Sequence, residues 1–240
     1  MKKLIILIPA LFCLFTVYSQ KTNIYQSGVI GEENLKAIAN LGPNTVGGIG
    51  FDTRYEGIKG TTRLFDTLVA SYLLVKGQEK YIQFNSDLDI VKNTLLFAHP
   101  STGKLMEIPS DDVIELIVMK DGKELVFKTT KGINFKKKIE GNKFYMVLKE
   151  GPHQFIRIPE KNFIEADYKA AYSADRRYDE FKPVSRYFIE DSNNVFQQIQ
   201  LNRKSLIKMF PEKKELINKE FQEKPDADNE EKVISILNKF

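Results

Sequence analysis

The chain has very little of the residue types on which most catalytic and metal sites depend. Its 240 residues include one cysteine, two histidines and no tryptophan. The cysteine, Cys13, lies in an apolar N-terminal segment, so the rest of the chain can form neither a disulfide nor a thiol nucleophile. His99 and His153 each adjoin a proline in an expected solvent-facing turn and are not spaced as a ligand pair. We therefore predict neither a metal ion nor a cofactor.

A strong charge of either sign is also missing. The formal net charge is +4, and about +2 remains without Lys2 and Lys3 of the N-terminal segment. Nucleic-acid-binding domains usually carry a marked basic excess, so we predict no nucleic-acid partner. A membrane-spanning helix needs about 20 apolar residues, and no run after the N-terminal segment is that long. We expect no transmembrane segment once that segment is removed.

The first 20 residues have the pattern of a secretory signal peptide. Two lysines precede an apolar run from Leu4 to Val17, which is followed by a short polar end at residues 18–20. We expect cleavage near Ser19 or Gln20. The exported product would act in the periplasm or outside the cell, and peripheral association with the outer membrane stays open.

Residues 21–60 show no sustained pattern, and we predict a flexible leader there. One short helical candidate runs from Glu32 to Asn40. The glycines that follow it, at positions 47, 48 and 50, lack the preceding strand and following helix that a phosphate-binding loop requires.

Residues 61–201 consist of short β-rich segments separated by turns. Connections this short join antiparallel neighbours, because a parallel crossover needs about a dozen residues or more. The predicted fold class is therefore mainly β: an antiparallel meander, curled into a barrel or folded into a sandwich, with a C-terminal helical tail. The predicted strands are Thr67–Val75, Lys80–Phe84, Asp87–Val91, Thr94–Phe97, Lys104–Ile108, Val113–Met119, Glu124–Thr129, Gly132–Ile139, Phe144–Lys149, Gln154–Ile158, Phe163–Ala171, Val184–Glu190 and Asn194–Leu201.

Residues 202–240 form the predicted helical tail. Proline fits the first turn of a helix but not its interior, so a short helix from Lys204 to Met209 should stop and a second should begin at Pro211. Asp228 and Glu231 suit a capping box for a third helix. Each helix is short and apolar on one side, so we expect the helices to dock on the β domain or on each other.

Two stretches of the chain resemble a family of uncharacterised secreted proteins from Bacteroidota. The segments RKSLIKMFPEKKELINKEF and NEEKVISILNKF are similar to the C-terminal tail of that family, in which a lysine-serine-leucine pattern leads into phenylalanine-proline and a charged helix. YEGIKGTTRLFD resembles the segment that opens its β domain. The resemblance covers most of the chain after Tyr55. It implies export and a β domain with a helical tail, and it carries no activity.

The segment FKTTKGINFKKKIEGNK, residues 127–143, is the most unusual surface that the sequence predicts. It contains six lysines and one glutamate, on what we expect to be two adjacent strands and their turn. We identify Lys131, Lys136, Lys138 and Lys143 as candidate ligand-binding residues for an anionic glycan, a lipid phosphate or an acidic protein. The alternative is that these lysines protect an edge strand from aggregation.

The sequence thus favours an exported binding or structural module of the cell envelope whose ligand it does not identify. A different class, a carboxylate-dependent hydrolase acting on a periplasmic or extracellular substrate, remains the alternative. The chain has no HExxH and no GxSxG motif. Catalytic residues are unknown, and a hydrolase would have to use dispersed carboxylates such as Asp87, Asp89 and Asp175.

Overall fold

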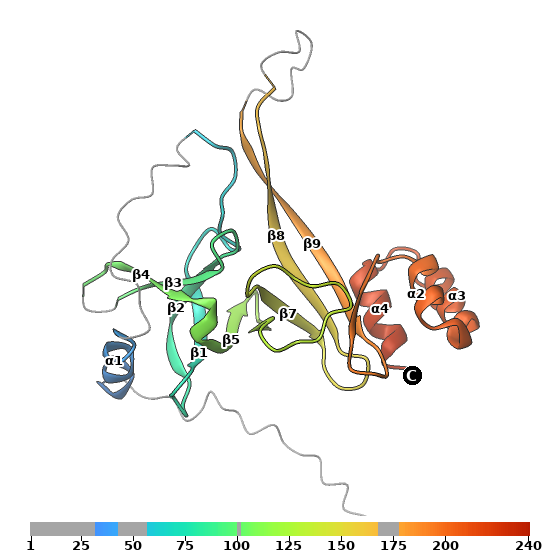
Figure 1. Cartoon of the computed structure of the whole chain (residues 1–240), viewed down its shortest axis with the longest axis horizontal. Coiled ribbons are helices and arrows are strands. Elements are labelled where there is room, and N and C mark those ends of the chain that lie inside the picture. Colours follow the sequence, from blue (N-terminus) through green and yellow to red (C-terminus); the bar gives the residue numbers. More distant parts are fainter. Residues whose placement is uncertain (1–31, 43–56, 100–101, 168–177) are drawn as a thin grey trace, which may run out of the picture.

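The computed structural model describes residues 32–42, 57–99, 102–167 and 178–240. The expected signal peptide and the glycine-rich passage lie outside these residues. The described residues form one ten-stranded antiparallel sheet with helices at the C-terminal end (Figure 1). The predicted mainly β fold class with a helical tail is therefore confirmed.

Most of the strands lie where alternation and turn residues predicted them. Two pairs of predicted strands each fall in one longer strand. Residues 80–84 and 87–91 belong largely to β2. Residues 154–158 belong largely to β8, which also includes the first two residues of the predicted strand 163–171; β8 ends at Ile164, and residues 168–171 lie outside the described residues. The strands are β1 (Val69–Val75), β2 (Ile82–Asp89), β3 (Thr94–Ala98), β4 (Leu105–Pro109), β5 (Val113–Lys120), β6 (Lys123–Thr129), β7 (Phe144–Lys149), β8 (Phe155–Ile164), β9 (Glu180–Glu190) and β10 (Phe196–Ile199).

The sheet has the order β10-β9-β8-β7-β6-β5-β1-β2-β3-β4. Strands that follow each other in the chain are paired in the sheet, except for β4 and β5, because β5 pairs with β1 instead. Only the short 3-10 helix η4 (Ser110–Asp112) joins β4 to β5. That connection can reach about 14 Å, whereas four strand spacings in a flat sheet amount to about 19 Å. This half of the sheet must therefore curl to bring β4 towards β5.

The curled half encloses the main core. Its strands contribute side chains that are almost fully buried, including Leu73, Leu88, Leu95, Ile108 and Leu116. The outermost strands of the sheet, β4 and β10, do not pair with each other. The result is one open, curled sheet rather than the closed barrel that the sequence left as an alternative.

Helix α1 (Glu32–Ala39) lies within the segment for which we predicted a flexible leader. Ile38 and Leu41 are nevertheless buried in the main core. The side-chain amide of Asn34 also exchanges hydrogen bonds with the main chain of Gln83 in β2, where the Gln83 N–H donates over 2.8 Å. This part of the segment is packed on the sheet, because its apolar helical stripe has a core to cover.

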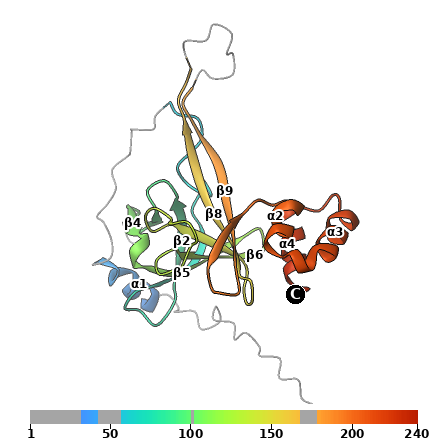
Figure 2. The ribbon, with the colours of Figure 1, turned by 45° about the vertical axis from the view of Figure 1, so that its right-hand side comes forward.

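The tail consists of α2 (Arg203–Met209), the 3-10 turn η5 (Pro211–Lys213), α3 (Lys214–Glu223) and α4 (Asn229–Leu237). Figure 2 shows these helices gathered beside β8 and β9. Leu206, Ile217 and Val233 are fully buried in one cluster with Phe155 and Ile189 of the sheet. The predicted break at Pro211 and the predicted docking of the tail are both confirmed.

Two finer predictions about the tail and its surroundings are wrong. The side chain of Asp228 makes no capping hydrogen bond, so the expected capping box is not formed. His153 does not simply face solvent: its ring packs edge-on against Phe210 and Phe240 of the tail, with ring centres 5.0 and 5.7 Å away. The docked tail covers this turn. The residues around His153 alone do not indicate where the tail packs, so the sequence pattern could not predict this contact.

Candidate functional site

The lysine-rich segment ends β6 at Thr129 and continues as a long loop in place of its second predicted strand. Residues 130–143 join β6 to β7, and the predicted strand Gly132–Ile139 is absent. The loop instead reaches the far edge of the sheet, where Phe135 forms a single parallel bridge with Phe196 of β10. The reason is burial: the rings of Phe135 and Phe188 pack 5.0 Å apart, so the apolar residues of the loop cover the sheet without a ladder.

Three of the four lysines predicted to bind a ligand have partners, and these partners lie on different elements. Lys131 forms an ion pair of 3.0 Å with Asp111 in η4, and this hydrogen bond lowers the pKa of the Asp111 carboxyl. Lys143 lies 4.0 Å from Glu160 of β8. Lys136 donates to Gln197 of β10 over 3.1 Å, whereas Lys138 is exposed. Of the four, only Lys136 lines the groove described next.

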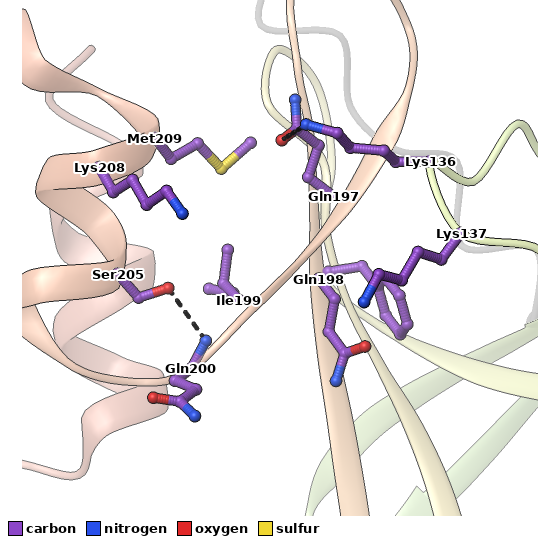
Figure 3. Close-up of a pocket in the computed structure, with 10 residues that line it drawn as sticks. Lys136, Lys137, Gln197, Gln198, Ile199, Gln200, Ser205, Lys208 and Met209 are labelled. Carbon is purple, nitrogen blue, oxygen red and sulfur yellow. Dashed lines mark hydrogen bonds between the residues drawn. The ribbon is translucent and has the colours of Figure 1, made fainter.

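A groove of about 600 Å³ lies at the edge strand β10, between the β6–β7 loop and helix α2 (Figure 3). Three ammonium groups line it, those of Lys136 and Lys137 from the loop and that of Lys208 from the helix. Among the residues that the structure describes, no acidic side chain lines it. The other lining residues are Phe188, Gln197, Gln198, Ile199, Gln200, Ser205 and Met209.

The groove straddles the sheet edge because β10 presents alternate side chains to opposite faces. Gln198 is opposite Phe188 in the register, so both lie on the face covered by the loop. Ile199 points to the other face, where it packs in the cluster formed with the tail. The single strand thus supplies both walls with side chains, and the loop and α2 supply the cations.

A chain of polar contacts orients the loop end of the groove. Lys136 Nζ donates to Gln197 Oε1, and Gln197 Nε2 donates to Asp191 Oδ2 over 2.6 Å. The hydrogen bond from Gln197, helped by the charge of Lys136, lowers the pKa of Asp191. The charge of Lys136 is therefore partly offset by Asp191. Within the part of the chain that the structure describes, Lys137 and Lys208 have no carboxylate partner.

A second hollow of about 540 Å³ adjoins the groove along α2. The two share Gln200, Ser205 and Lys208, and the second adds the cations of Arg203 and Lys204. The basic surface therefore continues beyond the groove, since none of the described residues that line either hollow is a carboxylate.

The carboxylates of the alternative hydrolase have structural partners. Asp87 and Asp89 share a face of β2, as predicted, and both are buried against residues 62–65. Asp87 accepts from Arg63 Nε at 2.8 Å, and Asp89 accepts from the Thr62 hydroxyl at 2.8 Å. Burial raises the pKa of Asp87. Neither carboxylate lines the basic groove, and Asp175 lies outside the described residues.

Membrane spans and metal clusters are both absent from the described residues. No helix among them is both long enough and apolar enough to cross a membrane. No group of three or more histidine, cysteine or acidic side chains among them could hold a metal ion.

Sequence reasoning missed most of the groove. Lys208 is far along the chain from Lys136 and Lys137, and only the docking of α2 brings them to one hollow. One sequence feature could have indicated a polar site at this strand. Phe196–Gln200 contains three glutamines, which is unusual for a strand that packs on a core. In comparisons with protein-family models, curated proteins and solved structures, no match was found for this chain.

Proposed function

We propose that this chain is an exported binding module of the cell envelope and that the basic groove beside β10 binds an anionic ligand. The observation that carries the proposal is the presentation of Lys136, Lys137 and Lys208 around one hollow that, among the described residues, no carboxylate lines. Ammonium groups in a partly enclosed hollow attract carboxylate, sulfate and phosphate groups through charge-assisted hydrogen bonds.

The lining supports binding more than catalysis. Its one hydroxyl, that of Ser205, accepts a hydrogen bond of 3.1 Å from the Gln200 N–H. In the described part of the chain, no histidine or carboxylate lines the groove to activate that hydroxyl as a nucleophile. The glutamine amides offer neutral donors and acceptors, which suit the recognition of a polar ligand.

The N-terminal pattern supports export. Mass spectrometry of the protein from its native host should find an N-terminus near Gln20 or Lys21, because signal peptidase removes the apolar segment. Cytosolic protein that retains Met1 would contradict export, and it would leave the chemistry of the groove unaffected.

Polyacrylate and uncharged polyacrylamide of matched length form the probe pair for the groove. Calorimetry with the full chain should show that polyacrylate binds, that polyacrylamide does not, and that binding weakens as salt screens exposed charges. The triple variant Lys136→Gln, Lys137→Gln, Lys208→Gln should lose at least about tenfold in affinity, since even one charge-assisted hydrogen bond of about 1.5 kcal/mol corresponds to that factor.

A second triple variant controls for net charge. Lys131→Gln, Lys138→Gln, Lys143→Gln removes the same charge from lysines that do not line the groove. It should keep the affinity of the parent within about twofold, because screened surface charges contribute little. Equal losses in both triple variants would mean that polyacrylate responds to overall charge, and the proposed function would then be wrong.

A further inference from the structure

The main chain of β10 is open at one position inside the groove. Alternate residues of an outermost antiparallel strand turn both N–H and C=O to the free edge. At Phe196 these groups are used, since its N–H donates to Asn134 O at 2.8 Å and its C=O accepts from Lys136 N at 3.0 Å. At Gln200 the N–H donates to Ser205 Oγ at 3.1 Å. Gln198 lies midway, so its N–H and C=O face the groove between two occupied positions.

This arrangement disfavours a peptide ligand that adds a strand. Strand addition depends on a run of open main-chain groups along a sheet edge. The β6–β7 loop occupies the edge at Phe196, and Ser205 occupies it at Gln200. Between them, only Gln198 offers a main-chain N–H donor and a C=O acceptor. These two groups suit a compact ligand group, such as a hydroxyl, that both accepts and donates hydrogen bonds.

We infer that the groove binds an acidic saccharide, a sugar chain that carries carboxylate or sulfate groups. The inference rests on the proposed function and specifies its ligand. Lys137 and Lys208 would bind the acid groups, and the main chain and side-chain amide of Gln198 would pair with ring hydroxyls. Met209, which is only partly buried, gives apolar surface for the C–H face of a sugar ring.

A lipid phosphate matches the groove less well. Phosphate oxygens that carry no proton only accept hydrogen bonds, so a phosphate group would satisfy the lysines and the Gln198 N–H, and a donor to the Gln198 C=O would have to come from another part of the headgroup. Sugar hydroxyls satisfy both main-chain groups.

The adjoining hollow indicates more than one sugar unit. It shares Gln200, Ser205 and Lys208 with the groove and adds Arg203 and Lys204. A chain that fills the groove with one acidic unit can place the next acidic unit beside these two cations. Affinity should therefore rise with the length of the saccharide.

Trigalacturonate is the probe for this inference, with monomeric galacturonate and fully methyl-esterified trigalacturonate as comparisons. Calorimetry with the full chain should show that the trimer binds more tightly than the monomer and that the uncharged ester does not bind measurably. The double variant Arg203→Gln, Lys204→Gln should lose about tenfold in affinity for the trimer and leave the monomer unchanged, because only the trimer reaches the second hollow.

Two substitutions of Gln198 test the open main-chain position. Gln198→Ala removes the side chain and keeps the N–H, whereas Gln198→Pro removes both, and proline is tolerated where the N–H of an edge strand faces outward. The proline variant should bind trigalacturonate several-fold more weakly than the alanine variant, up to about tenfold, which is the cost of one hydrogen bond between uncharged groups. If the proline variant does not fold, the amide signal of Gln198 in the ¹⁵N spectrum of the parent decides, since trigalacturonate should shift it.

The outcomes separate this inference from the proposed function. If polyacrylate binds through Lys136, Lys137 and Lys208 but trigalacturonate neither competes nor shifts the Gln198 amide, the groove binds anions and the saccharide inference is wrong. Binding of phosphatidylglycerol vesicles without binding of trigalacturonate would also overturn it, in favour of a lipid headgroup. Competition by trigalacturonate, with the length dependence above, supports it.

Discussion

Arg157 of β8 and Glu230 of α4 form an ion pair in which Nη1 lies 2.7 Å from Oε1, although 73 residues separate them in the chain. The Tyr187 hydroxyl of β9 donates to the same glutamate oxygen over 2.7 Å. Both side chains of the ion pair are less than one-third exposed. This carboxylate therefore joins two neighbouring strands to the last helix of the tail.

Replacement of Glu230 should destabilise the fold. Glu230→Ala leaves a partly buried guanidinium without its carboxylate, so the free energy of unfolding in urea should fall by about 1.5–3 kcal/mol, the usual range for hydrogen bonds to charged groups. Glu223→Ala is the matched control, because Glu223 pairs with Lys219 at 3.7 Å on an exposed helix face. That change should cost about 0.5 kcal/mol or less. Equal costs for the two variants would show that the Arg157 contact does not fasten the tail.

Glu220 of α3 should make the stability of the tail depend on acid pH. Its buried carboxylate accepts from Lys224, Lys239 and Ser235, and these bonds lower its pKa from 4.5 to about 2. The folded state holds the charged form more strongly than the unfolded state does. The contribution of Glu220 is therefore fully present above the unfolded pKa of 4.5 and is lost as pH falls towards about 2.

Glu220→Gln tests this pH dependence. At pH 7 the variant should be less stable by about 1–3 kcal/mol, because it loses the charge on the acceptor of these bonds. Thermal unfolding measured from pH 7 down to pH 2 should show the two proteins converging as Glu220 becomes protonated. A constant difference in melting temperature across that range would contradict the assigned role of the charge.

Phe210 should contribute strongly to the docking of the tail. Its ring is 6% exposed and packs edge-on against His153 and Phe240. Phe210→Ala should cost about 3–5 kcal/mol, as is usual for a buried phenylalanine, and hydrogen exchange should speed up in α2 and α4. The same substitution at Phe163, which is 47% exposed on the β8–β9 hairpin, serves as the control and should cost far less.

The strands were predicted correctly where clear turn residues separate segments of alternating polar and apolar residues. The predicted turn at residues 120–123 joins β5 to β6, and both Asp121 and Gly122 have positive φ there. Strand β8 was split in the prediction because Pro159 and the polar residues after it look like a turn. Pro159 is tolerated because β7 pairs with β8 only at residues 155–157, so the outer edge at Pro159 is free of strand partners.

The groove could not be assembled from the sequence, for reasons of tertiary packing. Phe135 and its apolar neighbours alternate as a strand would, yet they are used to cover Phe188 and Phe196 in a loop without a ladder. Because the loop packs on the sheet in this way, Lys136 and Lys137 lie beside β10, whereas Lys131 lies beside Asp111. The position of Lys208 depends on how α2 packs, which short helices with one apolar side do not specify by themselves.

Gly60 should be required where the chain segment before β1 lies against the β8–β9 hairpin, which extends away from the rest of the sheet (Figure 1). The Lys59 main chain bonds to Asp179 and Phe181 of that hairpin, at 2.8 and 2.9 Å. Gly60 has φ of +83°, and a Cβ there would lie 2.8 Å from the Phe181 carbonyl oxygen, so any side chain must displace the segment.

Gly60→Ala should therefore cost about 1–3 kcal/mol in the free energy of unfolding, the range for a strained backbone position, and should speed hydrogen exchange at the Phe181 amide, which donates to Lys59 O. Gly57→Ala is the matched control: Gly57 has φ of +81°, but a Cβ there would meet no atom within 4 Å. It shares the backbone strain and lacks the clash, so it should cost less and leave the Phe181 amide protected. Equal exchange rates at Phe181 in the two variants would mean that close packing at Gly60 does not hold the segment on the hairpin.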